Sequence, residues 1–385
     1  MSQLDVDKMV YRLGVVGLGH WFEMIHRGLS KNNEVVLSKV VGTRKFSDKA
    51  EELRKLNISE SNYFCIGEDP FIIPSGFFSS LDVMQISNPN KYHSSQTKQG
   101  LEEGLYVITE KTLATNKAEF DDLINFVKSG GYEEKVYLHL HYMHKLLTLN
   151  LPAMLEKIIP SHGKINSFSA TFFEEANEAD RMRSSWIFSP ESGGIFMDWI
   201  HPYEILLFGA KAQKISLSKI NTFIVNPEYD SKNPTGIESF VNVQGNNFTT
   251  NAKGVIRISK GLPHEAGLKR FVFSFESGSK LYLNFVGSQI EFNSDSRGSW
   301  QLVNEDHDQC RILDSGIPRG PATSELLVDD IIKLCKGGGP FIKIDDIIRI
   351  FEPQWDYQRM TKSQESIRDQ NQIEMFMRNG LSGRM

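Results

Sequence analysis

A strand, a glycine turn and a helix follow one another within residues 11–29, and this stretch constrains the fold more than any other. Residues 13–16 form a short apolar run suited to a buried strand. Gly17 and Gly19 follow at once, before the helical pattern begins. Such a turn binds a pyrophosphate, because glycines leave no Cβ in the way and the helix N-terminus offers free N–H groups. Since Phe22 replaces the third glycine of G-x-G-x-x-G, the motif alone fits an ordinary strand–turn–helix equally well.

From residue 11 to residue 145, strand-like and helix-like patterns alternate. The expected strands beyond the first are 34–42, 63–66, 81–86, 105–109 and 135–141, with helices at 47–56, 92–103 and 116–128. Helices between strands imply right-handed crossovers and a doubly wound parallel sheet. Ligands of such sheets bind at the carboxyl ends of the strands. The residues that fall there are Gly17, Thr43, Ser87, Glu110 and His141.

The rest of the chain has a different pattern. Extended runs at 164–173, 214–223, 239–243, 254–258, 270–275 and 280–285 are separated by turn signals, with helices expected at 151–159, 194–208, 324–335 and 345–360. We therefore expect an α/β fold with two domains. Residues 1–145 form a Rossmann-type NAD(P)-binding domain, and residues 146–385 form an α+β domain for substrate binding and oligomerisation. Its largely antiparallel open sheet is expected to join a homodimer or homotetramer.

Composition narrows the class of partner. The chain of 385 residues carries 43 basic and 48 acidic residues, so its net charge of −5 points to neither nucleic acid nor an anionic membrane. Three scattered cysteines fit a reducing compartment, and their spacing suits no metal. His139, His141 and His144 need not converge, so no metal is expected. The N-terminus lacks a signal-peptide pattern, and no apolar run approaches the ~20 residues of a membrane span. The expectation is a soluble cytoplasmic protein.

The end of the second expected strand indicates which dinucleotide would bind. An NAD site has an acidic residue there for the ribose 2′-hydroxyl. This chain instead has Thr43, Arg44 and Lys45 after Gly42. A hydroxyl followed by two cations suits a 2′-phosphate, so the prediction is NADP, with NAD as the alternative. A solvated basic turn would have the same composition.

Two further places carry residues suited to acid–base chemistry. Asp198 and His201 are three apart and share a helix face, where the carboxylate can fix the imidazole tautomer. Gly193 and Gly194 just before them allow a close approach. Lys111 follows the fifth strand, where a lysine can hydrogen-bond a substrate hydroxyl or the nicotinamide ribose. A purely structural Asp–His contact and an exposed Glu–Lys pair are the plainer alternatives.

Four motifs in this order resemble the Gfo/Idh/MocA family, the glucose–fructose oxidoreductase and inositol dehydrogenase group. They are Gly17-Leu-Gly19, Ser87-Asn88-Pro89-Asn90 with His93, Glu110-Lys111-Thr112, and Gly193-Gly194 with Asp198 and His201. Trp186, a short way ahead of the glycine pair, is also similar to the family. The resemblance runs by motif from residue 11 to residue 210, and by general shape beyond that.

The resemblance implies hydride transfer between a nicotinamide and a secondary hydroxyl or carbonyl of a sugar, sugar derivative or cyclitol. It implies that Lys111 contacts the reacting oxygen, that Asp198 binds a neighbouring hydroxyl and that His201 exchanges the proton. Other expected cofactor contacts are Gly17, Gly19, His20, Trp21, Thr43, Arg44, Lys45, Ser87, Asn88, Pro89, His93 and Glu110, with Lys111 also touching the ribose. Expected substrate contacts are His141, Tyr142, Lys145 and Trp186, besides Asp198.

Three positions depart from the family pattern: Phe22 for the third glycine, Thr112 for the proline after Lys111, and Ser87 for the usual threonine. None removes a catalytic group. Phe22 is expected to keep the first helix further from its strand. Two other functions stay open, an NAD-using glycosidase of the same family and a non-catalytic sensor. The sensor would be favoured by loss of Lys111, Asp198 or His201, and all three are present.

Overall fold

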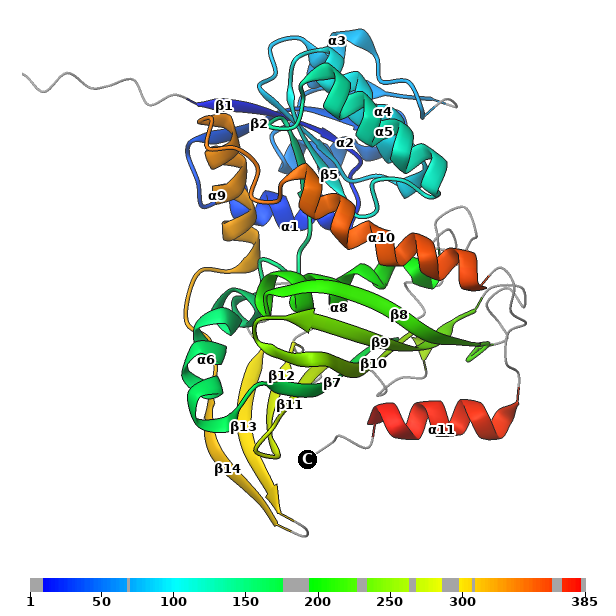
Figure 1. Ribbon diagram of the computed structural model, residues 1–385. Coiled ribbons are helices and arrows are strands. Elements are labelled where there is room, and N and C mark those ends of the chain that lie inside the picture. The colour runs from blue at the N-terminus through cyan, green and yellow to red at the C-terminus, as the bar shows by residue number, and fades with distance from the viewer. Residues whose placement is uncertain are drawn as a thin grey trace, which may run out of the picture. The chain divides into compact units, whose positions relative to one another are not determined.

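The computed structural model describes residues 10–67, 70–175, 194–226, 234–262, 268–285, 298–306, 309–361 and 369–381. The chain divides into two compact units (Figure 1). The first comprises Met1–His139 and Thr323–Ile347, and the second comprises Leu140–Ala322 and Ile348–Met385. Within the described ranges, no helix is both long and apolar enough to cross a membrane.

The first unit contains a six-stranded sheet in the order β3-β2-β1-β4-β5-β6, with every pair parallel. Its strands are β1 Tyr11–Val16, β2 Val35–Gly42, β3 Tyr63–Cys65, β4 Val83–Ile86, β5 Tyr106–Glu110 and β6 Val136–His139. Its helices are α1 His20–Leu29, α2 Phe46–Lys55, α3 Ser75–Phe78, α4 His93–Glu102, α5 Lys117–Gly130 and α9 Thr323–Cys335. The doubly wound parallel sheet is confirmed. Its strand order reverses between β1 and β4, the place where such sheets bind ligands.

Helix α9 returns to the first unit and packs against α1 (Figure 1). The two helices approach so closely that a Cβ on Gly28 would lie 2.1 Å from the carbonyl oxygen of Ser324. Phe22 is buried in the same apolar cluster as Val328 and Ile331 of α9. The ring in the third-glycine position therefore fills the core beneath α9. Relative to the expected ranges 1–145 and 146–385, residues 323–347 join the first unit because of this packing.

The second unit contains an eight-stranded sheet in the order β14-β13-β12-β11-β7-β10-β9-β8. The pair β7–β10 is parallel and the other pairs are antiparallel, which confirms the largely antiparallel sheet. The strands are β7 Ile165–Glu175, β8 Ala212–Phe223, β9 Gly236–Gly245, β10 Phe248–Leu262, β11 Leu268–Phe275, β12 Ser279–Asn284, β13 Ser299–Asp306 and β14 Gln309–Gly316. The hairpin β13–β14 is an addition to the strands expected from the sequence.

The helical segments of this part of the chain are short around the predicted site. The short segments are the 3₁₀ turn Gly194–Asp198, α8 Ile200–Glu204 and the π turn Ile205–Gly209. The longer helices are α6 Leu146–His162, α10 Ile344–Thr361 and α11 Gln370–Leu381. The single helix expected over 194–208 is thus three consecutive turns of different pitch.

The two faces of the second sheet are covered differently. Because side chains alternate along a strand, Phe172 and Phe173 of β7 point to opposite faces. The ring of Phe172 contacts Tyr142 at 5.2 Å between centroids. Phe173 packs against Phe376 of α11, which lies along the sheet in Figure 1. One face therefore carries the residues predicted to form the site, and α11 covers part of the other.

Candidate active site

In the first unit, the predicted cofactor residues follow the ends of adjacent strands. Gly17 leaves β1 with a φ of 98°, a conformation that favours glycine. A Cβ there would lie 2.9 Å from the backbone nitrogen of Asn88, so the turns after β1 and β4 touch at this point. Gly19 is the N-cap of α1, and among the described residues the atom nearest its missing Cβ is the Ser87 carbonyl oxygen, at 3.7 Å. The backbone around Gly17 and Gly19 thus leaves room at the helix N-terminus.

The basic turn after β2 is exposed at Thr43, Arg44 and Lys45. Its backbone is held by Tyr63, whose hydroxyl donates to the carbonyl of Arg44 at 2.7 Å. The three polar side chains therefore stand in solvent at the end of a fixed strand. The side chains of His20 and Trp21 lie outside the described part of the chain.

His93 is fully buried and joins two of the motifs. Its Nδ1 lies 2.7 Å from the carbonyl oxygen of Thr112, and its Nε2 lies 2.8 Å from that of Asn88. Burial lowers the pKa of His93 below its ordinary value. The ring therefore braces the Ser87–Asn90 turn against the segment after β5. The peptide bond between Lys111 and Thr112 in this segment is cis.

Glu110 ends β5 and Lys111 follows it, and both residues are buried. The Glu110 carboxylate contacts Nδ1 of His139, which ends the neighbouring strand β6. The carboxylate of Glu110 is thus engaged inside the protein. The pair anchors the chain just before Lys111.

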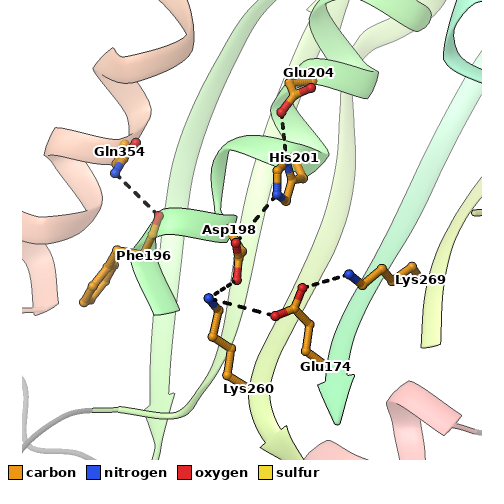
Figure 2. Close-up of polar contacts among 8 residues, drawn as sticks. All are labelled: Glu174, Phe196, Asp198, His201, Glu204, Lys260, Lys269 and Gln354. Atoms are coloured by element: carbon orange, nitrogen blue, oxygen red, sulfur yellow. Dashed lines mark hydrogen bonds and ion pairs between the residues drawn. The ribbon is translucent and has the colours of Figure 1, made fainter. Parts of the chain in front are cut away.

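The second unit brings Asp198 and His201 together, as their spacing predicted. His201 Nε2 lies 3.6 Å from Asp198 Oδ1, and both side chains are almost entirely buried (Figure 2). On its other side, His201 Nδ1 lies 2.8 Å from Glu204 Oε1. The imidazole is therefore held between two carboxylates from the same short helical segment.

Glu204 fixes the orientation of the ring. Its second oxygen accepts a hydrogen bond from the backbone N–H of Met143 at 3.0 Å, so both carboxylate oxygens are engaged. A neutral imidazole that donates its Nδ1–H to Glu204 has its lone pair on Nε2. That nitrogen points toward Asp198 in Figure 2. The arrangement suits Nε2 to accept a proton from a ligand bound beside Asp198.

Aromatic rings surround His201. The rings of His141 and Tyr142 lie 4.6 Å and 4.5 Å from it between centroids. Phe172 and Phe285 pack against Tyr142, and burial raises the pKa of the Tyr142 phenol above its ordinary value. Both predicted substrate residues thus lie next to the imidazole. Lys145 is the buried N-cap residue of α6, and Trp186 and Gly193 lie outside the described residues.

A charged network that the sequence did not suggest completes this cluster. Lys260 Nζ lies 2.6 Å from Asp198 Oδ2 and 3.9 Å from Glu174 Oε2. Lys269 pairs with the other oxygen of Glu174 at 2.8 Å. Glu204 was detectable, because it continues the three-residue spacing from His201. Lys260 and Lys269 could not be predicted from the sequence, because they meet Glu174 only through the pairing of β10 and β11 with β7.

The predicted catalytic set is divided between the two units. Lys111 belongs to the first, and Asp198 and His201 belong to the second. Among the residues whose placement is described, no group of three His, Cys, Asp or Glu could hold a metal ion. The second unit therefore supplies a buried acid–base pair, and the first supplies strand ends of the dinucleotide-binding type.

Comparisons with known proteins agree with this architecture. No family model matches the chain. The chain is 30% identical over 139 residues to scyllo-inositol 2-dehydrogenase (NADP(+)) IolU of Bacillus subtilis (strain 168), a match that covers 34% of this chain and 40% of that protein. The match thus spans well under half of the relative's length.

Solved structures share the fold over nearly the whole chain. KijD10, a 3-ketoreductase from Actinomadura kijaniata in complex with NADP and TDP-benzene, has a TM-score of 0.67 at 14% identity, covering 89% of this chain and 94% of its own. Levoglucosan dehydrogenase in complex with NADH has a TM-score of 0.67 at 14% identity, and the match covers 93% of this chain and 100% of that protein. UDP-N-acetylglucosamine 3-dehydrogenase GnnA from Acidithiobacillus ferrooxidans has a TM-score of 0.61 at 13% identity, and the match covers 90% of this chain and 96% of that protein. The fold that these structures share with the chain agrees with the resemblance to the Gfo/Idh/MocA oxidoreductases.

Proposed function

We propose that this protein is an NADP-dependent oxidoreductase that transfers hydride between the nicotinamide and a secondary hydroxyl or carbonyl of a sugar, sugar derivative or cyclitol. The observation that carries the proposal is the buried group of Asp198, His201 and Glu204, in which Nε2 of the imidazole is oriented toward Asp198. The similarity to an NADP-dependent inositol dehydrogenase supports the class of substrate.

The first unit has the features that a dinucleotide requires. The turn at Gly17 and the open N-terminus of α1 at Gly19 suit a pyrophosphate. The exposed Thr43, Arg44 and Lys45 after β2 suit a 2′-phosphate, and Ser87, Asn88 and Pro89 border the same strand ends. We assign the cofactor to these residues. His93 and Glu110 support them from inside the protein rather than through an exposed side chain.

In this reaction the bound nicotinamide supplies the hydride acceptor or donor. His201 takes the hydroxyl proton through Nε2 when the substrate is oxidised and returns it when a carbonyl is reduced. Asp198 accepts a hydrogen bond from a neighbouring hydroxyl and so fixes the sugar. Lys111 donates to the reacting oxygen, where its positive charge stabilises the developing alkoxide. His141 and Tyr142 form the wall against which the substrate ring lies.

An NAD-using glycosidase and a non-catalytic sensor are the competing functions. Absorbance at the NADPH band, followed over a panel of sugars, sugar phosphates and cyclitols, separates them from a dehydrogenase. The proposal predicts formation of NADPH in proportion to a ketone product. Release of a free sugar without net NADPH would identify the glycosidase. Binding of a sugar without turnover would identify the sensor.

The Arg44→Ala variant tests the choice of cofactor. If the exposed guanidinium pairs with the 2′-phosphate, its loss should raise the Kd for NADP by about 10-fold or more, since charge-assisted hydrogen bonds contribute about 1.5–3 kcal/mol. The Kd for NAD should change little, and intrinsic fluorescence titration measures both. Equal small effects on the two cofactors would contradict the assignment. Arg12→Ala, which removes an exposed arginine at the start of β1, is the matched control.

Two coarser properties complete the proposal. We place the protein in the cytoplasm, because its described cysteines are free and suit a reducing compartment. We also propose a homodimer or homotetramer formed through the sheet of the second unit. Exposed Ile312 and Leu313 on the edge strand β14 are the apolar residues available to such an interface. Light scattering of the purified chain measures its mass.

A further inference from the structure

Asp198 is held from two sides by groups on different elements. His201 Nε2 lies 3.6 Å from Oδ1, and Lys260 Nζ lies 2.6 Å from Oδ2. Lys260 comes from β10, far along the chain from the helical turn that carries Asp198. Its side chain is almost fully buried, so the contact is made away from water. Burying a lysine ammonium group costs free energy of desolvation unless its charge is paired. Here the partner is the predicted catalytic carboxylate.

The other side of Lys260 is closed by a second carboxylate. Glu174 of β7 lies 3.9 Å from Lys260 and 2.8 Å from Lys269 of β11. Burial by itself would raise the pKa of Glu174, but Lys269 and Lys260 together outweigh burial and hold that pKa below its ordinary value. Three adjacent strands thus present lysine, glutamate and lysine side by side, ending at Asp198 (Figure 2).

Lys260 acts as a fixed cation in this network. Burial alone would lower the pKa of Lys260, but the carboxylates of Asp198 and Glu174 outweigh burial and raise it. An ammonium group that keeps its proton throughout the working range is an electrostatic anchor and a poor proton carrier. The row of charged side chains formed by Lys260, Glu174 and Lys269 therefore does not carry protons between Asp198 and solvent. Its effect is to fix the position and charge of Asp198.

We propose that Lys260 is a positioning residue for Asp198: it engages one carboxylate oxygen so that the other stays directed at His201 and at a substrate hydroxyl. The inference rests on the proposed function. Without Lys260, Asp198 and Glu204 would face His201 with no cation beside Asp198. Among the described residues, the charged and titratable groups that contact His201 or belong to the network ending at Asp198 are Asp198 and Glu204 on its own segment, His141 and Tyr142 after β6, Lys260 on β10, Glu174 on β7 and Lys269 on β11.

The Lys260→Met variant tests the proposal, because it keeps the length of the side chain and removes the charge. Without the positive charge of Lys260, Asp198 and the protonated imidazole of His201 hold their protons more strongly. The unprotonated His201 that acts as the base is then formed only at higher pH. The acidic limb of the kcat/KM profile should move up by about one pH unit, and kcat/KM below that limb should fall about 10-fold. The Lys260→Arg variant, which keeps the positive charge, should restore most of the position of the acidic limb and most of kcat/KM below it. The Kd for NADP, read by fluorescence, should stay the same.

Arg257→Met is the matched control. Arg257 lies on the same strand, and its Nε pairs with Glu238 Oε1 at 2.7 Å; its side chain is 15% exposed. Because side chains alternate, its charge points to the face opposite Lys260. The control should lose stability without moving the pH profile. A Lys260→Met profile that keeps its acidic limb, or one that moves no further than the control, would overturn the proposal.

A second measurement does not depend on turnover. The ¹⁵N resonance of the Lys260 ammonium group, assigned by its loss in Lys260→Met, should shift in Asp198→Asn. An unchanged resonance would contradict the ion pair and with it the positioning role. Absence of NADP-linked turnover in the wild-type protein on every substrate would instead overturn the proposed function. The two failures are therefore distinguishable.

Discussion

The His201→Ala variant is expected to lose turnover by about 10²–10⁴-fold, the usual contribution of a positioned acid–base group. The reason is geometric. The imidazole is held by Glu204 at Nδ1 and directs Nε2 toward Asp198, so its removal takes away the nitrogen that is proposed to carry the proton. Steady-state absorbance at the NADPH band gives kcat, and fluorescence titration gives the Kd for NADP, which should not change.

The matched control for this variant is His162→Ala. His162 lies in the second unit too, where it forms a hydrogen bond of 2.9 Å with Ser279 at the end of α6. Removing it deletes a histidine of the same size and a comparable hydrogen bond at a distance from the proposed chemistry. Turnover of this control should remain within about twofold of wild type, as for surface substitutions. Full turnover of His201→Ala on the true substrate would refute the assigned role.

The Phe22→Ala variant is expected to lower the free energy of unfolding by about 3–5 kcal/mol. Phe22 is 3% exposed and shares its apolar cluster with residues of β1 and α9, so the truncation leaves a cavity where α1, α9 and the sheet meet. Because the free energy of unfolding of a typical domain is about 5–15 kcal/mol, such a loss is severe. Urea unfolding followed by far-UV circular dichroism measures it.

Glu23→Ala provides the comparison on the same helix. Glu23 is exposed, and its removal should change stability by about 0.5 kcal/mol or less. If Phe22→Ala were as stable as this control, the ring would not be part of the core as described. The third-glycine position would then need another explanation.

Much of the first unit could be predicted from the sequence because its signals are local. The apolar run before Gly17, the alternation of strands and helices and the glycine turn each depend on neighbouring residues. The same holds for Asp198 and His201, whose three-residue spacing brings them together on a short helical segment. The role of Phe22 could not be predicted in this way. It depends on α9, which follows about 300 residues later and returns to pack on α1.

The surroundings of the acid–base pair were harder to predict for a similar reason. Lys260, Glu174 and Lys269 meet through strand register, since β7 pairs with β10 on one side and β11 on the other. No pattern within any one of these strands marks its lysine or glutamate as part of a site. His93 illustrates the reverse case: its motif was visible, but its burial between the carbonyls of Asn88 and Thr112 was not.

The central claim is that Asp198 and His201, with Oδ1 and Nε2 held 3.6 Å apart, act on the substrate as one acid–base pair. A double-mutant cycle on the rate of hydride transfer, measured by stopped-flow absorbance of NADPH, tests it most directly. Residues that act as a unit are strongly non-additive. The Asp198→Asn, His201→Ala double variant should be about as slow as the slower single variant. Losses that multiply, or full activity of Asp198→Asn, would contradict the claim.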